Sequence, residues 1–395
     1  MAEIDKGLPN TRTQVELPGA EDTEVQISEE QTQKGPVEII PGEDGGATVD
    51  FDPSAVNQPS TESHFDNLAD ILPDEVLDPI GSELRANYTD YKSSRKEWER
   101  AYTEGLDLLG FKYENRNQPF QGSSGATHPV LAEAVTQFQA TAFKELLPAD
   151  GPVRTQILGS NSTEKESQAQ RVKDFMNYQI MDQMEEYEPE FDSMLFHLPL
   201  SGSTFKKVYY DDLLGRAVSK FVPADDLIVP YTANSLDDAA AIMHVLKISE
   251  NDLRKQQVGG FYSDIDLGTA GDNVKDEITN KEKELEGISK SGKQQNIFTL
   301  LECHVDLDID GFEDMGPEGE PTGIKLPYIV TIDEGSTKVL SIRRNYAPND
   351  PKRKRVQYFV HFKFLPGLGF YGFGLIHMIG GLSRTATSAL RQLLD

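Results

Sequence analysis

Residues 356–395 constrain the fold more than any other part of the chain. This segment begins with a strand-like run, continues through the aromatic and glycine-rich residues GLGFYGFG, and ends in a helical pattern. One set of apolar residues in that helix repeats at intervals of three and four: Ile379, Leu382, Ala386, Leu390 and Leu393. Polar residues repeat at the same spacing on another face: Arg384, Ser388, Arg391 and Asp395. The pattern predicts a strand, a sharp corner and an amphipathic helix, with one face packed against neighbours and the other facing water or a polyanion.

The corner also contains a GxGxxG spacing. In a dinucleotide-binding fold, such glycines let the backbone approach a pyrophosphate at the start of a helix. That fold needs a second strand and an acidic residue about 20 residues further on, whereas this sequence stays helical through Leu394. Phe370 and Tyr371 would also crowd a phosphate. For these reasons a nucleotide-binding enzyme that uses these glycines is only the less favoured alternative. The favoured interpretation is a corner packed by aromatic rings and built on Pro366, Gly367, Gly369, Gly372 and Gly374.

The chain is strongly acidic, with a formal net charge of −28 and a pI near 4.6. This balance excludes an overall basic surface for gripping nucleic acid. The charge is distributed unevenly, because residues 1–66 are rich in Glu and Asp while basic residues outnumber acidic ones after residue 343. Residues 1–66 show no helical or strand period and cannot bury enough apolar surface to offset the entropy of ordering. They are predicted to form an acidic disordered tail.

Residues 67–366 have helical patterns first and strand patterns later. The expected helices are at 79–109, 130–147, 163 onward and 275–285. The expected strands are at 152–158, 204–210, 217–222, 239–248, 298–308, 324–333 and 338–344. Turn-rich segments separate the later strands, which indicates antiparallel pairing, and there is no regular alternation of strand and helix. The predicted fold class is α+β.

No pattern typical of an enzyme or a metal site is present in the sequence. Cys303 is the only cysteine, and on a strand its side chain and that of His304 would point to opposite faces. The run DLDIDG at 306–311 copies the start of a calcium-binding EF-hand loop, but the position of the final glutamate ligand is Pro317. We therefore expect no catalytic residue, cofactor or metal. The single cysteine indicates a reducing compartment. The sequence contains neither a signal peptide nor an apolar run of roughly 20 residues, so we expect no membrane partner.

Basic residues near the C-terminus are the candidates for contact with nucleic acid. Residues 352–355 form a basic run just before the last strand and could contact phosphate, although a solvated loop is the favoured reading. Two arginines of the final helix could make such contacts if their face is turned towards DNA. The candidate DNA-facing residues are Lys352, Arg353, Lys354, Arg355, Arg384 and Arg391.

Three stretches together resemble the portal proteins of tailed bacteriophages, which connect the head to the tail. In 194–211, MLFHLPLSGSTFKKVYYD, a helix leads through a glycine turn into a lysine-bearing strand. The second stretch is 221–230, FVPADDLIVP, followed by the strand at 239–248. In the third, 364–395, the residues FLPGLGFYGFG open the last helix. The order and spacing of these stretches carry the resemblance, which covers about 67–395.

The resemblance implies a portal wing at 67–366 and the start of a stem helix at 367–395. Subunits of this family form a ring, here expected to hold twelve copies, at one capsid vertex of the virion. Double-stranded DNA is packaged through the ring by the terminase large subunit and is later ejected into the tail. Capsid and tail adaptor proteins are the other implied partners. The portal subunit itself is structural and non-catalytic, and it assembles in the cytoplasm of the bacterial host.

The final helix ends without a glycine cap, a proline or a polar stretch. The family pattern continues with a clip region, a second stem helix and a crown, so the chain is expected to be the N-terminal portion of such a protein. Another phage morphogenesis factor, a scaffold or a head–tail adaptor, is the alternative within the same setting.

Overall fold

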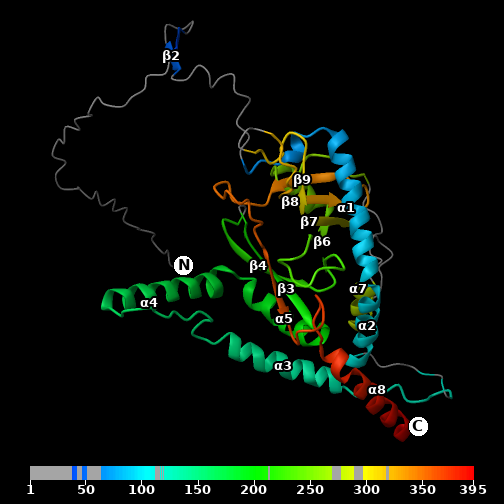
Figure 1. Ribbon diagram of the computed structural model, residues 1–395. Helices are drawn as coiled ribbons and strands as arrows, with labels where there is room; N and C mark the ends of the chain where they lie inside the picture. The colour runs from blue at the N-terminus through cyan, green and yellow to red at the C-terminus, as the bar shows by residue number, and fades with distance from the viewer. Residues whose placement is uncertain are drawn as a thin grey trace, which may run out of the picture. The chain divides into compact units, whose positions relative to one another are not determined.

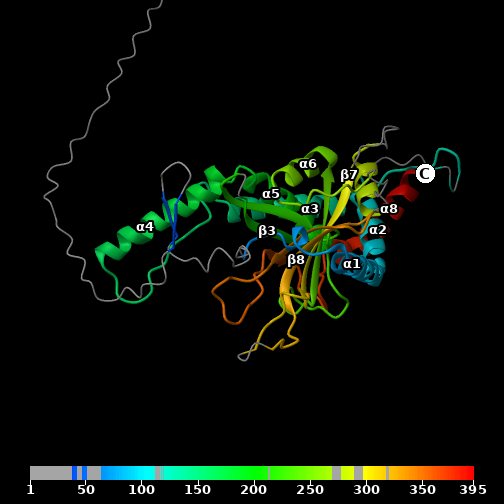
Figure 2. The ribbon, with the colours of Figure 1, turned by 90° about the horizontal axis from the view of Figure 1, so that it is seen from above.

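Two antiparallel sheets form where the sequence alternates apolar and polar residues, and helices cover them (Figures 1 and 2). The computed structural model describes residues 38–41, 47–50, 64–111, 116, 118, 120–211, 214–268, 277–288, 297–316 and 320–395. Residues 64–395 belong to one compact unit, which includes the last helix. The predicted α+β class is confirmed.

The larger sheet has five strands in the order β5-β6-β7-β8-β9. Their bounds are Leu227–Ile228, Ala241–Ser249, Ile297–Leu307, Leu326–Asp333 and Val339–Arg344. The smaller sheet has three strands in the order β10-β3-β4, with bounds Phe359–Lys363, Ser203–Asp211 and Arg216–Pro223. All of these pairs are antiparallel. The smaller sheet therefore joins the last strand of the chain to a hairpin far earlier in the sequence.

The two faces of the five-stranded sheet have different coverings. Cys303 and Met243 lie on the face that packs against apolar residues of α1, Asp74–Ser94. His304 follows Cys303 and lies on the opposite face, as the strand period predicts, where its ring is 5.2 Å from that of Phe359 in the three-stranded sheet. Leu253 of α6, Glu250–Val258, covers the far end of this second face. The strand period therefore determines which residues meet the smaller sheet.

The remaining helices gather around the smaller sheet and the end of α1. They are α2 (Lys96–Leu106), α3 (Val130–Leu146), α4 (Thr163–Tyr178), α5 (Tyr187–Ser201), α7 (Glu277–Leu285) and α8 (Leu375–Leu394). Short helices η2 (Leu68–Asp70) and η3 (Asp107–Leu109) precede α1 and follow α2, and a π-helical turn, η4 (Gln179–Gln183), links α4 to α5. Apolar residues of α2, α3, α5, α7 and α8 share one cluster. In both ribbon views α4 extends away from the sheets, and none of its residues is buried.

The structure corrects several predicted elements. Residues 152–158 form no strand, because no neighbouring strand is available to pair with them. The first long helix begins at Asp74 rather than at Pro79, which lies inside it, and it is interrupted at Arg95. Ser162 is the N-cap of α4 and accepts a hydrogen bond from the backbone of Lys165.

Two short strands lie inside the region predicted to be a disordered tail. β1, Glu38–Pro41, pairs antiparallel with β2, Ala47–Asp50. The sequence pattern did not predict this pair, and the rest of 1–63 lies outside the described residues. His64 and Phe65 already contact the five-stranded sheet, since Arg344 and Arg343 at the end of β9 donate to their carbonyl oxygens at 3.3 and 2.8 Å. Within the described part of the chain, no helix has both the length and the apolarity needed to cross a bilayer.

Candidate functional site at the corner before helix α8

Close backbone packing defines the corner between β10 and α8. Gly202, at the end of α5, has a φ of 91°, and a Cβ atom there would lie 2.5 Å from the carbonyl oxygen of Gly372. A Cβ on Gly374 would lie 2.3 Å from the carbonyl oxygen of Leu200. None of the corner glycines has a positive φ, so Gly372 and Gly374 serve close approach rather than an unusual turn. Gly367 contacts the ring of Phe373 more loosely, and Gly369 and the exposed Pro366 lie at the outer part of the loop.

Three consecutive backbone amides at the end of this corner, those of residues 372–374, are hydrogen-bonded within the chain. The Gly372 amide donates to Ser203 Oγ at 2.8 Å, and the Phe373 amide donates to the Leu365 carbonyl at 2.9 Å. The Gly374 amide donates to His377 Nδ1 at 3.1 Å. A phosphate cradle needs free amides at the start of its helix. The amides of residues 372–374 are used within the chain, which favours a structural role for this part of the corner.

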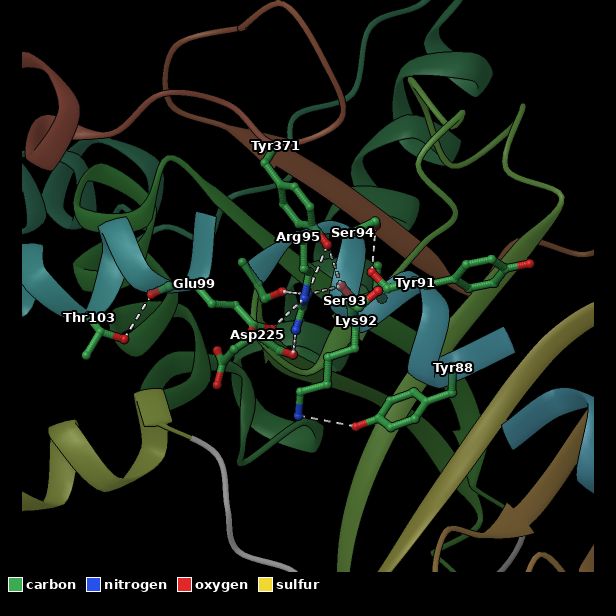
Figure 3. A network of polar contacts seen from close by, with 12 residues as sticks. Tyr88, Tyr91, Lys92, Ser93, Ser94, Arg95, Glu99, Thr103, Asp225 and Tyr371 are labelled. Carbon is green, nitrogen blue, oxygen red and sulfur yellow. Dashed lines mark hydrogen bonds and ion pairs between the residues drawn. The ribbon is translucent and has the colours of Figure 1, made fainter. Parts of the chain in front are cut away.

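Aromatic rings fill the corner on both sides. Phe370 is buried and stacks on Phe205 of β3 with a centroid distance of 5.8 Å. Tyr371 stacks on Trp98 of α2 at 4.7 Å. The two neighbouring rings therefore connect the corner to the three-stranded sheet and to α2, and Figure 3 shows Tyr371 reaching the junction of α1 and α2.

Arg95 lies at that junction and binds several segments at once. Its guanidinium donates to the carbonyl oxygens of Ala224 and Leu227 at 2.9 and 3.0 Å, and to that of Asp225. It also donates to the Tyr371 hydroxyl at 2.9 Å and pairs with Glu99 at 2.8 Å (Figure 3). We call this group of contacts around Arg95 the arginine latch. It joins the α1–α2 junction, the segment before β5 and the corner.

Electrostatics keep the latch charged despite its burial. Burial lowers the pKa of Arg95, but Tyr371 and Glu99 more than offset this and raise the pKa above its ordinary value. Sequence reasoning missed Arg95, although a signal was present. Arg95 lies four residues after Tyr91 and three before Trp98, in register with the apolar stripe of this helical region. A charged residue at such a position needs buried partners.

A second buried polar cluster joins the two sheets. Lys207 of β3 contacts both carboxylate oxygens of Glu302 at 2.6 Å, and His304 Nε2 lies 2.9 Å from Glu302 Oε1. Burial would raise the pKa of Glu302, but Lys207 and His304 hold it well below its usual range. His244 pairs with Glu302 across β6 and β7, and burial lowers its pKa to about 3. The arrangement binds the sheets through an ionised carboxylate.

The basic run before β10 is partly neutralised by the chain itself. Arg353 pairs with Asp314, and Arg355 pairs with Asp306 at 2.9 Å. The side chains at 352 and 354 are exposed, and the backbone amides of both residues donate to the Asp350 carboxylate at 3.0 Å. Of the four candidates, Lys352 and Lys354 remain exposed to solvent. Both ribbon views place this loop far from α8, so the six candidate residues do not form one surface.

Arg384 and Arg391 do lie on one side of α8. Arg384 pairs with Glu104 of α2 at 3.4 Å, and both side chains are largely exposed. Arg391 donates through Nε to the Ala126 carbonyl at 2.7 Å and through its terminal nitrogen to Thr127 Oγ1 at 3.2 Å. The two candidates therefore differ: the loop at Ala126 and Thr127, before α3, holds the Arg391 side chain, whereas the Arg384 side chain extends towards solvent.

The apolar face predicted for this helix packs within the chain only in part, since Ile379 packs against a core cluster and Ala386 and Leu390 are half-buried. The buried positions are Ile376, Gly380, Ser383 and Thr387. Leu382 is 69% exposed and Leu393 is 84% exposed. The inner face combines Ile376 with small residues, and a Cβ built on Gly380 would lie 3.3 Å from Leu108. Met378, Leu382 and Leu393 are left on a solvent-facing side.

Comparisons with known proteins identify no relative. No protein-family model matches the chain, and no curated protein matches it.

Proposed function

We propose that the chain is the wing and the first stem helix of a bacteriophage portal subunit. In this proposal, copies of the subunit, twelve by analogy with the family, form a ring at one capsid vertex. Double-stranded DNA passes through the ring, driven inward by the terminase large subunit and later ejected through tail adaptor proteins. The role is structural and involves no catalysis by this chain.

The observation that carries the proposal is the exposed apolar side of α8. Met378, Leu382 and Leu393 are exposed, although the same helix buries small and polar residues against its own chain. Helix α4 shows the same property, because Val172, Phe175 and Met176 are exposed and no residue of that helix is buried. Contiguous exposed apolar side chains on helices are typical of surfaces that bind other protein subunits.

The corner supports the same proposal. The close backbone contacts at Gly202 and Gly374, together with the arginine latch, fix the direction in which α8 leaves the sheets. A subunit of a ring needs such a fixed geometry, because a closed assembly forms only when every copy presents its interface at the same angle.

Ring formation by the full-length protein tests the proposal. Mass photometry and negative-stain electron microscopy should reveal closed rings. Replacing Leu382 with Lys should shift the protein to monomers, because a charge would enter the subunit contact. Val258→Lys is the matched control, since Val258 is 76% exposed at the end of α6, and this variant should still form rings. A wild-type protein that stays monomeric across micromolar concentrations contradicts the proposal.

A further inference from the structure

A cleft of about 410 Å³ lies along α8, against η3 and the segment around Thr127. Arg384, Ser388 and Arg391 line it from α8, and Arg116 lines it from the preceding loop. Volumes of this size are in the range of small-ligand sites. Most of the lining residues carry a polar or charged group, and Leu108 is the exception, although the carbon atoms of these side chains also face the cleft.

The charges in the cleft favour an anion. Three arginines line it together with two carboxylates, those of Asp107 and Asp395. Asp107 is compensated by Lys281 at 2.7 Å, and Asp395 accepts a hydrogen bond from the Ser124 amide at 2.5 Å. Outside the lining, Glu104 pairs with Arg384 at 3.4 Å, and both of these side chains are largely exposed to solvent. Within the lining the three arginines outnumber the two carboxylates, on a chain with a net charge of −28.

The arginines are arranged on the helix at suitable spacing. Arg384, Ser388 and Arg391 are separated by four and three residues, so they lie on one side of α8. The Ala126 carbonyl and Thr127 Oγ1 hold the Arg391 guanidinium in place, which reduces the entropy lost when it binds a ligand. Guanidinium and hydroxyl groups together are typical of phosphate recognition.

We propose that this cleft binds a phosphate group of the DNA backbone. Among the described residues that line the cleft none is aromatic, so these residues offer no platform on which a base could stack. A backbone phosphate needs no such platform, whereas a free nucleotide would leave its base without a partner. The assignment of DNA as the source of the phosphate rests on the proposed function, and the contact is independent of base sequence.

Fluorescence anisotropy with a short random-sequence duplex tests the proposal. The full-length protein is titrated at several salt concentrations, and the slope of log affinity against log salt is measured. Each phosphate contact contributes about 0.9 to this slope. Arg384→Gln should weaken binding and lower the slope by about 1, and the double replacement with Arg391→Gln should lower it by about 2. Arg384 is 64% exposed, so its single variant should fold normally.

The control is the double variant Lys255→Gln and Lys325→Gln, which removes the same charge from two exposed side chains that are not candidate DNA-facing residues. This variant should leave the slope within about 0.5 of the wild type. Unchanged binding by Arg384→Gln and by the double arginine variant overturns the inference. Tight binding of inorganic pyrophosphate by a protein that does not bind the duplex also overturns the inference, in favour of a free phosphate ligand. If the protein forms rings that bind DNA independently of Arg384 and Arg391, only the inference about the cleft fails. If the protein stays monomeric but binds DNA through these arginines, only the portal proposal fails.

Discussion

Arg95 shows how one buried side chain can join distant segments at the scale of a residue. A guanidinium has five N–H donors in a planar fork, and burying it without partners would be unfavourable. Here the partners are three carbonyl oxygens of 224–227, the Tyr371 hydroxyl and Glu99. Since these groups are themselves buried or partly buried, they depend on Arg95 as much as it depends on them.

Replacing Arg95 with Met should destabilise the protein by roughly 3–5 kcal/mol, the range for breaking a buried charged network. The carbonyl oxygens of 224–227 would lose their donor, and Glu99 would lose its counter-charge. Urea unfolding measures the free energy. Trp98 is the only tryptophan and stacks on Tyr371, so its fluorescence reports directly whether the arginine latch is intact.

Arg100→Met on the same helix is the matched control. Arg100 is mostly exposed and pairs with Glu97 and Glu104, so its removal should change stability by less than about 1 kcal/mol. Arg95→Lys should restore only part of the loss, because one ammonium cannot reach all the partners of the fork. Equal destabilisation by Arg95→Met and Arg100→Met would contradict the role of the latch.

At the scale of an element, the free edge of β4 is protected by helix α5. The Glu190 carboxylate accepts a hydrogen bond from the Phe221 amide at 2.7 Å, and Glu186 accepts one from the Ser219 amide at 3.3 Å. Glu186 also pairs with Arg216 at 2.8 Å. Glu186 and Glu190 are four residues apart and lie on one side of the helix, and Ser219 and Phe221 are two residues apart and face one side of the strand, so each carboxylate reaches one amide. The acidic side chains satisfy amides that would otherwise be open to pairing with another chain.

Glu190→Ala should leave the Phe221 amide without its acceptor and cost about 1–3 kcal/mol. Hydrogen exchange followed by mass spectrometry should show faster exchange in the peptide that contains β4. Glu188→Ala is the control, because Glu188 is exposed on the same helix, and it should change neither stability nor exchange. Identical exchange of β4 in the two variants would rule out edge protection by Glu190.

Local elements could be predicted from the sequence because their periods are local. Apolar alternation located β3, β4 and β6 to β9 but not the short β5, and three-to-four spacing located α3 and α8. The strand at 152–158 was wrong because strand formation also needs a neighbour, which composition does not supply. The packed face of α8 was only partly predicted, because the helix turns Gly380, Ser383 and Thr387 inward beside Ile376 and leaves Leu382 and Leu393 exposed. The spacing of residues identifies the most apolar face of a helix, but it does not tell how closely that face can approach neighbouring elements.

At the scale of the whole molecule, the contacts that hold the site together join segments far apart in the sequence. Tyr371 meets Arg95 and Gly372 meets Ser203 across long separations. A repeating pattern of residues cannot predict such distant pairs. The sequence therefore predicted the corner, but it predicted neither the arginine latch nor the close contact of the corner with Gly202. The cluster of Lys207, Glu302 and His304 was missed for the same reason, since it forms only when the two sheets meet.

This sheet interface makes stability depend on pH. Burial lowers the pKa of His244 to about 3, with Glu302 opposing this shift and Lys207, His304 and Lys220 adding to it. An unfolded histidine has a pKa near 6.5. Below that pH the unfolded chain binds a proton that the folded chain excludes, so stability falls as the pH falls. Burial likewise lowers the pKa of three further histidines: His197, His304 and His361.

Acidification from pH 7.5 to 5 should therefore destabilise the wild-type protein, with His244 alone contributing about 2 kcal/mol. His244→Gln cannot take up a proton, so its unfolding free energy should fall less over the same interval, even if it is lower at pH 7.5. Urea unfolding of both proteins at pH 7.5, 6.5, 5.5 and 5 measures the two slopes. The difference between the slopes isolates His244, because the other buried histidines are common to both proteins. Parallel slopes would show that His244 is protonated equally in the folded and unfolded chains, contrary to its buried position between the sheets.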